Sequence, residues 1–213
     1  IGILGDYDVD GATSSSILKL FFDHYNIRSE IYIPDRLKEG YGPNKNAINT
    51  FYDKGVKTFI TVDCGATSFN VMDFANQKGM KAIIIDHHKV DEQLPKCIAH
   101  INPSREEDSS LLNDLAAVGL TFIFIVALRR AIRNLNLFPD INEPGLKQYL
   151  DLVALGTVCD VVQLKGLNRA FVKEGIEVIS QRKRPGIEGL RSISGSSDTV
   201  SYTHLRAHET SID

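Results

Sequence analysis

The chain has 213 residues, of which 43% are hydrophobic and 24% charged; this composition excludes a disordered chain and allows one large or two small domains. A formal net charge of −3 gives no compositional case for nucleic-acid binding, and the most apolar stretch, residues 116–128, is shorter than the about 20 residues that span a membrane. Three cysteines without zinc-site spacing, and no signal peptide, predict a cytoplasmic protein in a reducing compartment, without a membrane partner.

Short apolar runs predict strands in the first half of the chain, and the amphipathic runs between them predict helices. The chain opens at Ile1 rather than methionine, directly inside the first run, so we expect a fragment with a missing N-terminal part. In chain order, the predicted elements are a strand at 1–4, a helix at 12–25, a strand at 30–33, a charged, glycine-rich loop at 35–42, a helix at 43–54, a strand at 58–62, a helix at 68–78, and strands at 81–85 and 97–101. Pro43 is expected at the first helical turn, which suits proline. This alternation predicts an α/β fold over residues 1–105, with a parallel five-stranded sheet and helices on both faces.

From residue 111 the pattern indicates helices alone, at 117–135, 145–157 and 166–184. We therefore predict an all-helical part at 106–195, which completes a single domain at 1–195. Residues 196–213 are expected to form an irregular tail, and from about Val200 they resemble translated sequencing-adapter read-through. His204 and His208 are four residues apart, but a lone pair of this kind is weak evidence for a metal site.

Acidic residues gather where predicted strands end. Asp6, Asp8 and Asp10 alternate between the first strand and the first helix, and three charges this close repel one another unless a cation or water screens them. In open parallel sheets, ligands bind in the crevice beyond the carboxyl ends of the strands. The residues expected to share this crevice with the three aspartates are Asp63, Asp86, His87, His88 and Asp160.

Carboxylates and histidines without thiolates suit Mn²⁺ or Mg²⁺ better than a structural zinc. One divalent ion would leave excess negative charge, whereas two ions about 3.5–4 Å apart that share a carboxylate would balance it. Such a pair lowers the pKa of a bridging water and clamps a phosphoryl group, so we predict metal-assisted hydrolysis of a phosphoester. Each residue also has a purely structural alternative: Asp63 as a turn residue, either histidine as a helix cap, and Asp160 as the N-cap of the next segment. Their common position at the mouth of one sheet favours the site.

Four ordered motifs resemble those of the DHH phosphoesterase superfamily, at residues 6–11, 62–65, 86–88 and 156–162. The first motif, Asp-Tyr-Asp-Val-Asp-Gly, is similar to that of the RecJ branch, the single-stranded-DNA-specific 5′→3′ exonucleases. Further segments that resemble this branch are Arg36 with residues 39–42, Asn102-Pro103, residues 115–119 and Asn168-Arg169. The resemblance covers roughly residues 1–195.

The resemblance implies a role for each candidate ligand. Asp8 would hold one metal ion and Asp10 the other, and Asp63 would bridge them. His87 and Asp160 would complete the second site. The resemblance therefore implies a two-ion enzyme that uses Mn²⁺ or Mg²⁺.

Other implied roles stay open between two alternatives. Asp6 would lie beside the first metal, as a ligand or an outer-shell group, and His88 would lie near the scissile phosphate or support the ligands. Arg36 and Arg169 would bind substrate phosphate or form surface salt bridges. The catalytic residues that the resemblance implies are Asp63, His87 and His88.

The resemblance implies an exonuclease that acts on single-stranded DNA in repair and recombination, with a single-strand-binding protein or a helicase as a candidate partner. The sequence departs from the family in two ways. Gln163 stands where the family usually has proline, and we expect little effect from this change. The C-terminal DHHA1 domain and OB-fold are absent, so we expect a fragment that binds metal but cleaves DNA weakly. The basic run at 181–185 fits a helix C-terminus better than a DNA channel.

Two alternative functions remain at this point. One is another DHH phosphoesterase, acting on oligoribonucleotides, cyclic dinucleotides, nucleoside bisphosphates or pyrophosphate. The other is a non-enzymatic binding protein of replication complexes. The three-aspartate form of the first motif favours the exonuclease over the former, and the complete set of motif ligands favours it over the latter.

Overall fold

Five parallel strands form one sheet with the order β2-β1-β3-β4-β5 in the computed structural model, which describes residues 1–193. The strands are β1 (Gly2–Gly5), β2 (Glu30–Tyr32), β3 (Thr58–Val62), β4 (Lys81–Ile85) and β5 (Ala99–Ile101). The predicted α/β class and five-stranded parallel sheet are therefore confirmed, and β3 and β4 have the predicted bounds. The expected tail at 196–213, with His204 and His208, lies outside the described residues.

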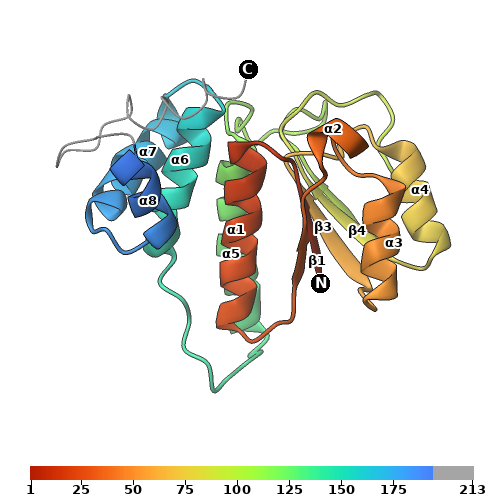
Figure 1. Ribbon diagram of the computed structural model, residues 1–213, viewed down its shortest axis with the longest axis horizontal. Helices are drawn as coiled ribbons and strands as arrows, with labels where there is room; N and C mark the ends of the chain where they lie inside the picture. Colours follow the sequence, from red (N-terminus) through yellow and green to blue (C-terminus); the bar gives the residue numbers. More distant parts are fainter. Residues whose placement is uncertain (194–213) are drawn as a thin grey trace.

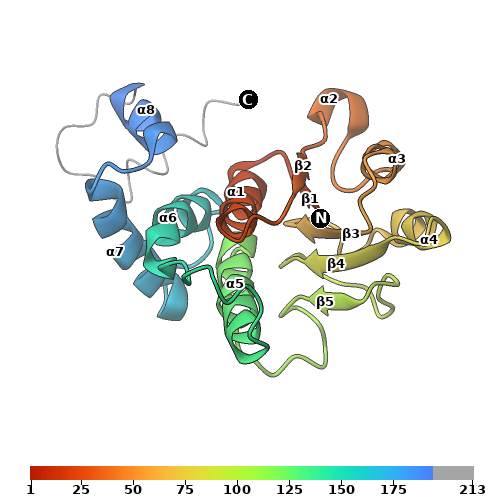
Figure 2. The same ribbon diagram turned by 90° about the horizontal axis from the view of Figure 1, so that it is seen from below.

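Helices cover both faces of the sheet (Figures 1 and 2). On one face lie α1 (Val9–His24) and α5 (Ala117–Asn134), and on the other lie α3 (Lys45–Asp53) and α4 (Phe69–Gln77). The helices beyond α1 are α6 (Leu150–Cys159), preceded by the 3-10 turn η1 (Leu146–Tyr149), then α7 (Gly166–Ser180) and α8 (Pro185–Ile193). Within the predicted all-helical second half, α5 therefore lies on the sheet, whereas α6 packs on α1 and α5, and α7 packs on α6, in a third layer away from the sheet. Within residues 1–193, no helix has both the length and the apolar character needed to cross a bilayer.

Alternation along the strands divides the apolar residues into two cores. In β3, Phe59 packs with the α3 and α4 side, whereas Ile60 and Val62 pack with the side of α1 and α5. A parallel strand that is buried on both faces reads as a continuous apolar run, as residues 58–62 do. The sheet is therefore held rigidly from both sides.

Helix α6 is buried along its whole length, because α1 lies on one side of it and α7 on the other. Gly156 allows the close approach to α1, since a Cβ atom there would lie 2.3 Å from Thr13 Oγ1. This packing brings the end of α6, and Asp160 after it, to the start of α1. The alternative in which Asp160 is the N-cap of the next helix is wrong, because Asp160 is the C-cap residue of α6 and α7 starts only after Lys165.

Strand β1 has β2 on one side and β3 on the other, so the connections that follow β1 and β2 run in opposite directions across the sheet. Gly5 and Val62 are neighbours in the register of β1 and β3. The ladder continues one residue beyond each strand, with Asp6 N 3.3 Å from Val62 O, Asp63 N 3.0 Å from Ile85 O and Asp86 N 3.0 Å from Ile101 O. Three aspartates therefore stand side by side at the carboxyl edge of the sheet, at the point where ligands usually bind in such folds.

Several helix boundaries differ from the predictions because side chains cap the backbone. Helix α1 begins at Val9 rather than residue 12, with Asp8 as its N-cap. Pro43 precedes α3 rather than opening it, since Asn44 is the N-cap and accepts a hydrogen bond from Ala47 N. Asp35 similarly caps a one-turn helix, α2 (Arg36–Glu39), within the predicted loop. The predicted helix at 166–184 ends at Ser180.

Candidate metal centre

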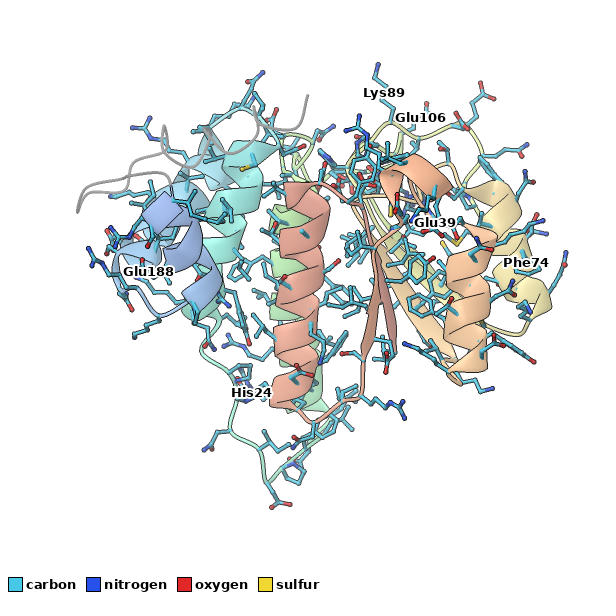
Figure 3. The ribbon with its side chains drawn as sticks, viewed as in Figure 1. His24, Glu39, Phe74, Lys89, Glu106 and Glu188 are labelled. Atoms are coloured by element: carbon cyan, nitrogen blue, oxygen red, sulfur yellow. The ribbon has the colours of Figure 1, made fainter. Side chains whose placement is uncertain are left out.

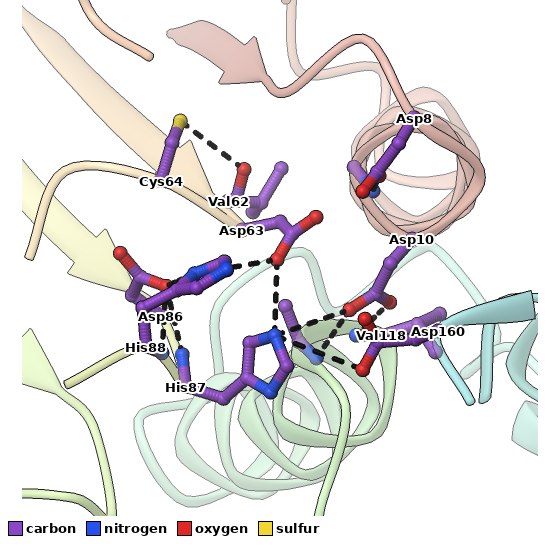
Figure 4. Close-up of polar contacts among 12 residues, drawn as sticks. Asp8, Asp10, Val62, Asp63, Cys64, Asp86, His87, His88, Val118 and Asp160 are labelled. Carbon is purple, nitrogen blue, oxygen red and sulfur yellow. Dashed lines mark hydrogen bonds and ion pairs between the residues drawn. The ribbon is translucent and has the colours of Figure 1, made fainter. Parts of the chain in front are cut away.

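The first acidic motif joins the end of β1 to the first turn of α1. Asp6 is 3% exposed, and its Oδ1 atom has no hydrogen-bond partner in the described part of the chain. Burial raises the pKa of Asp6 to about 6, partly opposed by a hydrogen bond from the backbone of Tyr7. Asp8 accepts a hydrogen bond from Gly11 N at 2.9 Å, and Figure 4 shows Asp8 and Asp10 on the side of α1 that faces Asp63.

Asp10 connects the centre to α5. Its two carboxylate oxygens accept hydrogen bonds from Ala117 N at 2.7 Å and Val118 N at 2.8 Å. Ala116, the N-cap of α5, makes no side-chain cap, so Asp10 supplies the acceptors that this helix end needs. Burial and the neighbouring Asp160 raise the pKa of Asp10, and the two N–H groups oppose that rise.

Asp63 has an unusual backbone and an unsatisfied side chain. Its φ angle is 61°, in the left-handed region that residues other than glycine seldom adopt. Neither carboxylate oxygen has a hydrogen-bond partner among the described residues, although the side chain is only 1% exposed. Burial raises the pKa of Asp63 to about 12, with further increases from Asp10 and Asp8. Such a carboxylate is costly unless a cation compensates it.

Asp86 organises the loop that follows β4. Its Oδ1 atom accepts hydrogen bonds from His87 N at 2.8 Å and His88 N at 3.2 Å, and Oδ2 accepts one from Ala66 N at 2.9 Å. His88 Nδ1 lies 2.8 Å from Oδ1 as well. Burial would raise the pKa of Asp86, but the hydrogen bonds and the charge of His88 lower it overall. Asp86 is therefore an ionised acceptor that fixes both histidines.

His87 projects into the middle of the acidic cluster, as the dashed lines in Figure 4 show. Its Nε2 atom has no hydrogen-bond partner among the described residues. The carboxylate oxygens nearest to Nε2 belong to Asp63 at 3.3 Å, Asp160 at 3.7 Å and Asp10 at 3.9 Å. Burial, followed by the neighbouring His88, lowers the pKa of His87, which favours the neutral imidazole that metals bind.

The ligand atoms form three overlapping sets in which all atoms lie within 4.8 Å of one another. These sets are Asp6, Asp8 and Asp63; Asp10, His87 and Asp160; and Asp63, His87 and His88. Asp63 belongs to the first and third sets and His87 to the second and third, and Asp63 Oδ1 lies 3.3 Å from His87 Nε2, so these two residues connect Asp6 and Asp8 to Asp10 and Asp160. Asp63 Oδ1 and Oδ2, Asp6 Oδ1 and His87 Nε2, which have no hydrogen-bond partner within residues 1–193, all belong to residues of this cluster, so the residues fit divalent cations.

The donor chemistry also indicates hard cations. Cys64 follows Asp63 directly, but its sulfur faces the carbonyls of Val62 at 3.4 Å and Leu4 at 3.8 Å and lies on the other side of the strand end (Figure 4). Burial raises the pKa of this thiol well above its usual range. The set thus consists of carboxylates and imidazoles, which suit Mn²⁺ or Mg²⁺.

His88 stands at the open side of the centre. Its side chain is 49% exposed, and its Nδ1 atom lies 3.9 Å from Asp63 Oδ1. The hydrogen bond to Asp86 raises the pKa of His88, partly opposed by burial. His88 therefore combines access to solvent with a bias toward the protonated form.

The two arginines differ in their relation to the centre. Arg36 lies on α2 with its guanidinium 5.2 Å from the centroid of the Tyr7 ring, directly beside the first motif. Arg169 is exposed on the first turn of α7, next to Asn168, whose amide donates to the Asp114 and Gln163 carbonyls. Within residues 1–193, neither guanidinium forms an ion pair, so the surface salt-bridge alternative finds no partner there.

Sequence reasoning assigned no role to several residues that hold the centre in place. Asn102 Nδ2 donates to His88 O at 2.9 Å, and Ser104 Oγ donates to His87 O at 3.0 Å. Tyr41 contacts both Asp63 and His88. The only signals in the sequence were the Glu-Gly-Tyr-Gly and Asn-Pro segments, which carried the resemblance without a function.

Comparison with known proteins agrees with this geometry. Residues 1–157 match the family described as "DHH family, N-terminal domain". The single-stranded-DNA-specific exonuclease RecJ of Dickeya dadantii is 38% identical over 198 residues, which cover 91% of this chain and 34% of that protein. The chain thus spans about a third of the length of this relative.

Two solved structures share the architecture over 96% of the chain. A crystal structure of exonuclease RecJ bound to manganese has a TM-score of 0.82 and 28% identity, and 49% of that chain is covered. A structure of RecJ from Thermus thermophilus in complex with Mn²⁺ has a TM-score of 0.76 and 25% identity, with 28% of that chain covered.

Proposed function

This chain belongs to the DHH family, and from that premise we propose that it carries the metal-dependent hydrolytic centre of a single-stranded-DNA-specific 5′→3′ exonuclease. The observation that carries the proposal is the position of Asp63 between two ligand groups, with neither of its carboxylate oxygens hydrogen-bonded in the described chain. The resemblance of the first motif, and the names of the relatives reported above, support the exonuclease over other phosphoesterases of the family.

We assign the ligands to two sites. Asp6, Asp8 and Asp63 would hold one Mn²⁺ or Mg²⁺ ion, and Asp10, His87 and Asp160 the other, with Asp63 shared. When bound, such ions make a water molecule nucleophilic near neutral pH and neutralise charge on a phosphoryl group. The protein supplies the fixed carboxylates, held at the edge of a sheet that is packed on both faces.

His88 and the arginines would act on the substrate. His88 is protonated more readily than a free histidine because Asp86 holds its Nδ1, so it can donate to a phosphate oxygen or a leaving group from the open side. Arg36 is the better candidate of the two arginines for a phosphate contact, since its stacking on Tyr7 places it beside the first motif. For Arg169, a contact with substrate phosphate is supported only by the resemblance to the RecJ branch.

In the whole protein, this domain at residues 1–195 would degrade single-stranded DNA in the cytoplasm during repair and recombination. Contacts along the strand, and any partner such as a single-strand-binding protein or a helicase, would involve the rest of the longer protein. The acidic centre by itself repels a phosphate backbone, so bound metal ions and other segments of the whole protein would supply the attraction for DNA.

The test compares two substrates with one preparation. The chain is incubated with Mn²⁺ and either 5′-labelled single-stranded DNA or a cyclic dinucleotide, with Asp63→Asn and EDTA as controls. We expect mononucleotides from the DNA, at a rate that both controls abolish. Turnover of the cyclic dinucleotide alone would contradict the exonuclease function and support another phosphoesterase of the family. A chain with an intact fold that binds no Mn²⁺ would support a non-enzymatic binding protein.

A further inference from the structure

A short loop between α2 and α3 is built so that one side chain reaches the centre. Gly40 and Gly42 have φ angles of 78° and 79°, in the left-handed region, and they bracket Tyr41. Glu39, labelled in Figure 3 between α2 and α3, anchors the base of the loop. Its carboxylate accepts hydrogen bonds from Tyr32 Oη at 2.6 Å, Asp35 N at 2.9 Å and Asn44 Nδ2 at 3.2 Å.

Tyr41 makes two contacts at the centre. Its hydroxyl group donates to the backbone carbonyl of Asp63 at 3.1 Å. The same oxygen lies 3.3 Å from His88 Nδ1, and the two rings meet edge to face with centroids 5.9 Å apart. Because Nδ1 already lies 2.8 Å from Asp86 Oδ1, the Asp63 carbonyl is the acceptor left for the hydroxyl proton.

The backbone of Asp63 depends on few restraints. Its N–H group donates to Ile85 O at 3.0 Å, and its carbonyl accepts the Tyr41 hydroxyl. Its carboxylate accepts no hydrogen bond among the described residues and contacts His87 Nε2 at 3.3 Å, so the direction of this carboxylate depends largely on the backbone conformation. A left-handed conformation is disfavoured for aspartate, so it needs restraint from its surroundings.

We propose that Tyr41 is a positioning residue of the metal centre: its hydroxyl group holds Asp63 in the left-handed conformation that aims the shared carboxylate between the two ligand groups, and its ring limits the rotation of His88. The proposal deepens the proposed function and rests on it. Its first readout is metal affinity rather than turnover.

The experiment measures Mn²⁺ affinity by isothermal titration for the unaltered chain, Tyr41→Phe and Tyr41→Leu. Tyr52→Phe is the matched control, because Tyr52 is exposed on α3 with its ring beneath Lys78 and takes no part in the centre. Loss of a group that orients a ligand typically costs about tenfold or more in metal affinity, so we expect about a tenfold weaker Mn²⁺ affinity for Tyr41→Phe and no change for Tyr52→Phe. Tyr41→Leu should also slow turnover at saturating Mn²⁺, because it removes the contact with His88.

Unfolding of each variant in EDTA separates positioning from a general loss of structure. Equal midpoints for Tyr41→Phe and the unaltered chain, together with weaker Mn²⁺ affinity, support the proposal. Mn²⁺ affinity within twofold of the unaltered chain, or a loss matched by lower stability in EDTA, overturns it. Failure of the unaltered chain to bind Mn²⁺ overturns the proposed function itself, whereas normal binding with no effect at Tyr41 overturns only this inference.

Discussion

The end of β3 and the first turn of α1 each bring a buried aspartate to the centre, but the two carboxylates differ in their hydrogen-bond partners. Asp10 accepts two backbone N–H groups from the start of α5, so its carboxylate has structural partners before any cation binds. Neither carboxylate oxygen of Asp63 accepts a hydrogen bond in the described part of the chain, and its backbone is held in a left-handed conformation. Asp10 therefore contributes to the packing of the helices, whereas Asp63 is placed there at a cost to the fold.

This difference shows that two proposed ligands of one centre can have opposite effects on the stability of the fold. Both side chains lie within reach of His87 Nε2, so distance alone does not distinguish them. The hydrogen-bond partners do, because a buried acceptor with partners stabilises the folded chain and one without partners destabilises it. Activity and stability should consequently respond in different ways at the two positions.

The largest effect is expected on catalysis. Asp63→Asn and Asp10→Asn each remove a ligand, and we expect kcat/KM on single-stranded DNA to fall by about 100-fold or more, since metal ions contribute several kcal/mol to such reactions. Arg36→Ala, which removes one exposed charge beside the centre, should cost about tenfold or less. Comparable losses for Arg36→Ala and Asp63→Asn in a labelled-DNA assay would contradict the shared-ligand role of Asp63. Asparagine is preferable to alanine here because it tolerates the left-handed backbone.

Stability without metal should change in opposite directions at the two positions. In Asp10→Asn, the amide NH₂ group faces one of the α5 donors, and a buried unpaired N–H group costs about 1–3 kcal/mol. In Asp63→Asn, an amide that needs no proton replaces a buried carboxyl group whose pKa is raised to about 12 and which must take up a proton when the chain folds near neutral pH, so the free energy of unfolding should rise by on the order of 1 kcal/mol. Urea unfolding in EDTA measures both changes. Two variants that shift in the same direction would remove the distinction between the residues.

The smallest effect concerns a buried residue outside the centre. His100 in β5 is 7% exposed, and neither ring nitrogen has a hydrogen-bond partner among the described residues. Burial, followed by the charge of Arg105, lowers the pKa of His100, against the opposing charges of Asp86 and Glu107. A lowered pKa in the folded state gives stability that is present above about pH 6.5 and is lost as the pH falls.

The unaltered chain should therefore lose stability between about pH 6.5 and pH 5 more steeply than His100→Leu, by about 1 kcal/mol per pH unit or less. Unfolding curves across this range in EDTA give the difference. Mn²⁺ should leave the His100 contribution unchanged, because this residue lies outside the ligand sets. If the stability of the two proteins fell equally with pH, burial of His100 would not be the cause of the loss of stability.

Much of the sheet was predictable because its strands are buried on both faces. Residues 58–62 and 81–85 form continuous apolar runs that stop at polar residues, and those limits are the observed ones. Helix limits were less predictable, since Asp8, Asp35 and Asn44 cap helices through side-chain hydrogen bonds that periodicity does not show.

The motif residues of the centre were also predictable, because parallel strands place their carboxyl ends at one edge. Their partners were not. The hydrogen bonds from α5 to Asp10 join residues more than a hundred positions apart, and the sequence around Asp10 does not indicate them. Tyr41 and Asp86 likewise act through contacts that exist only once the strands are paired.

The strand order has a consequence for folding kinetics. The proposed ligands come from the end of β1, the start of α1, the end of β3, the loop after β4 and the end of α6, so most of the described chain must fold before they meet. Contacts between distant segments form late, because closing long loops costs entropy before any contact compensates it. We therefore expect metal affinity to appear only after these segments have packed together, so that Mn²⁺ binding during refolding would report their assembly.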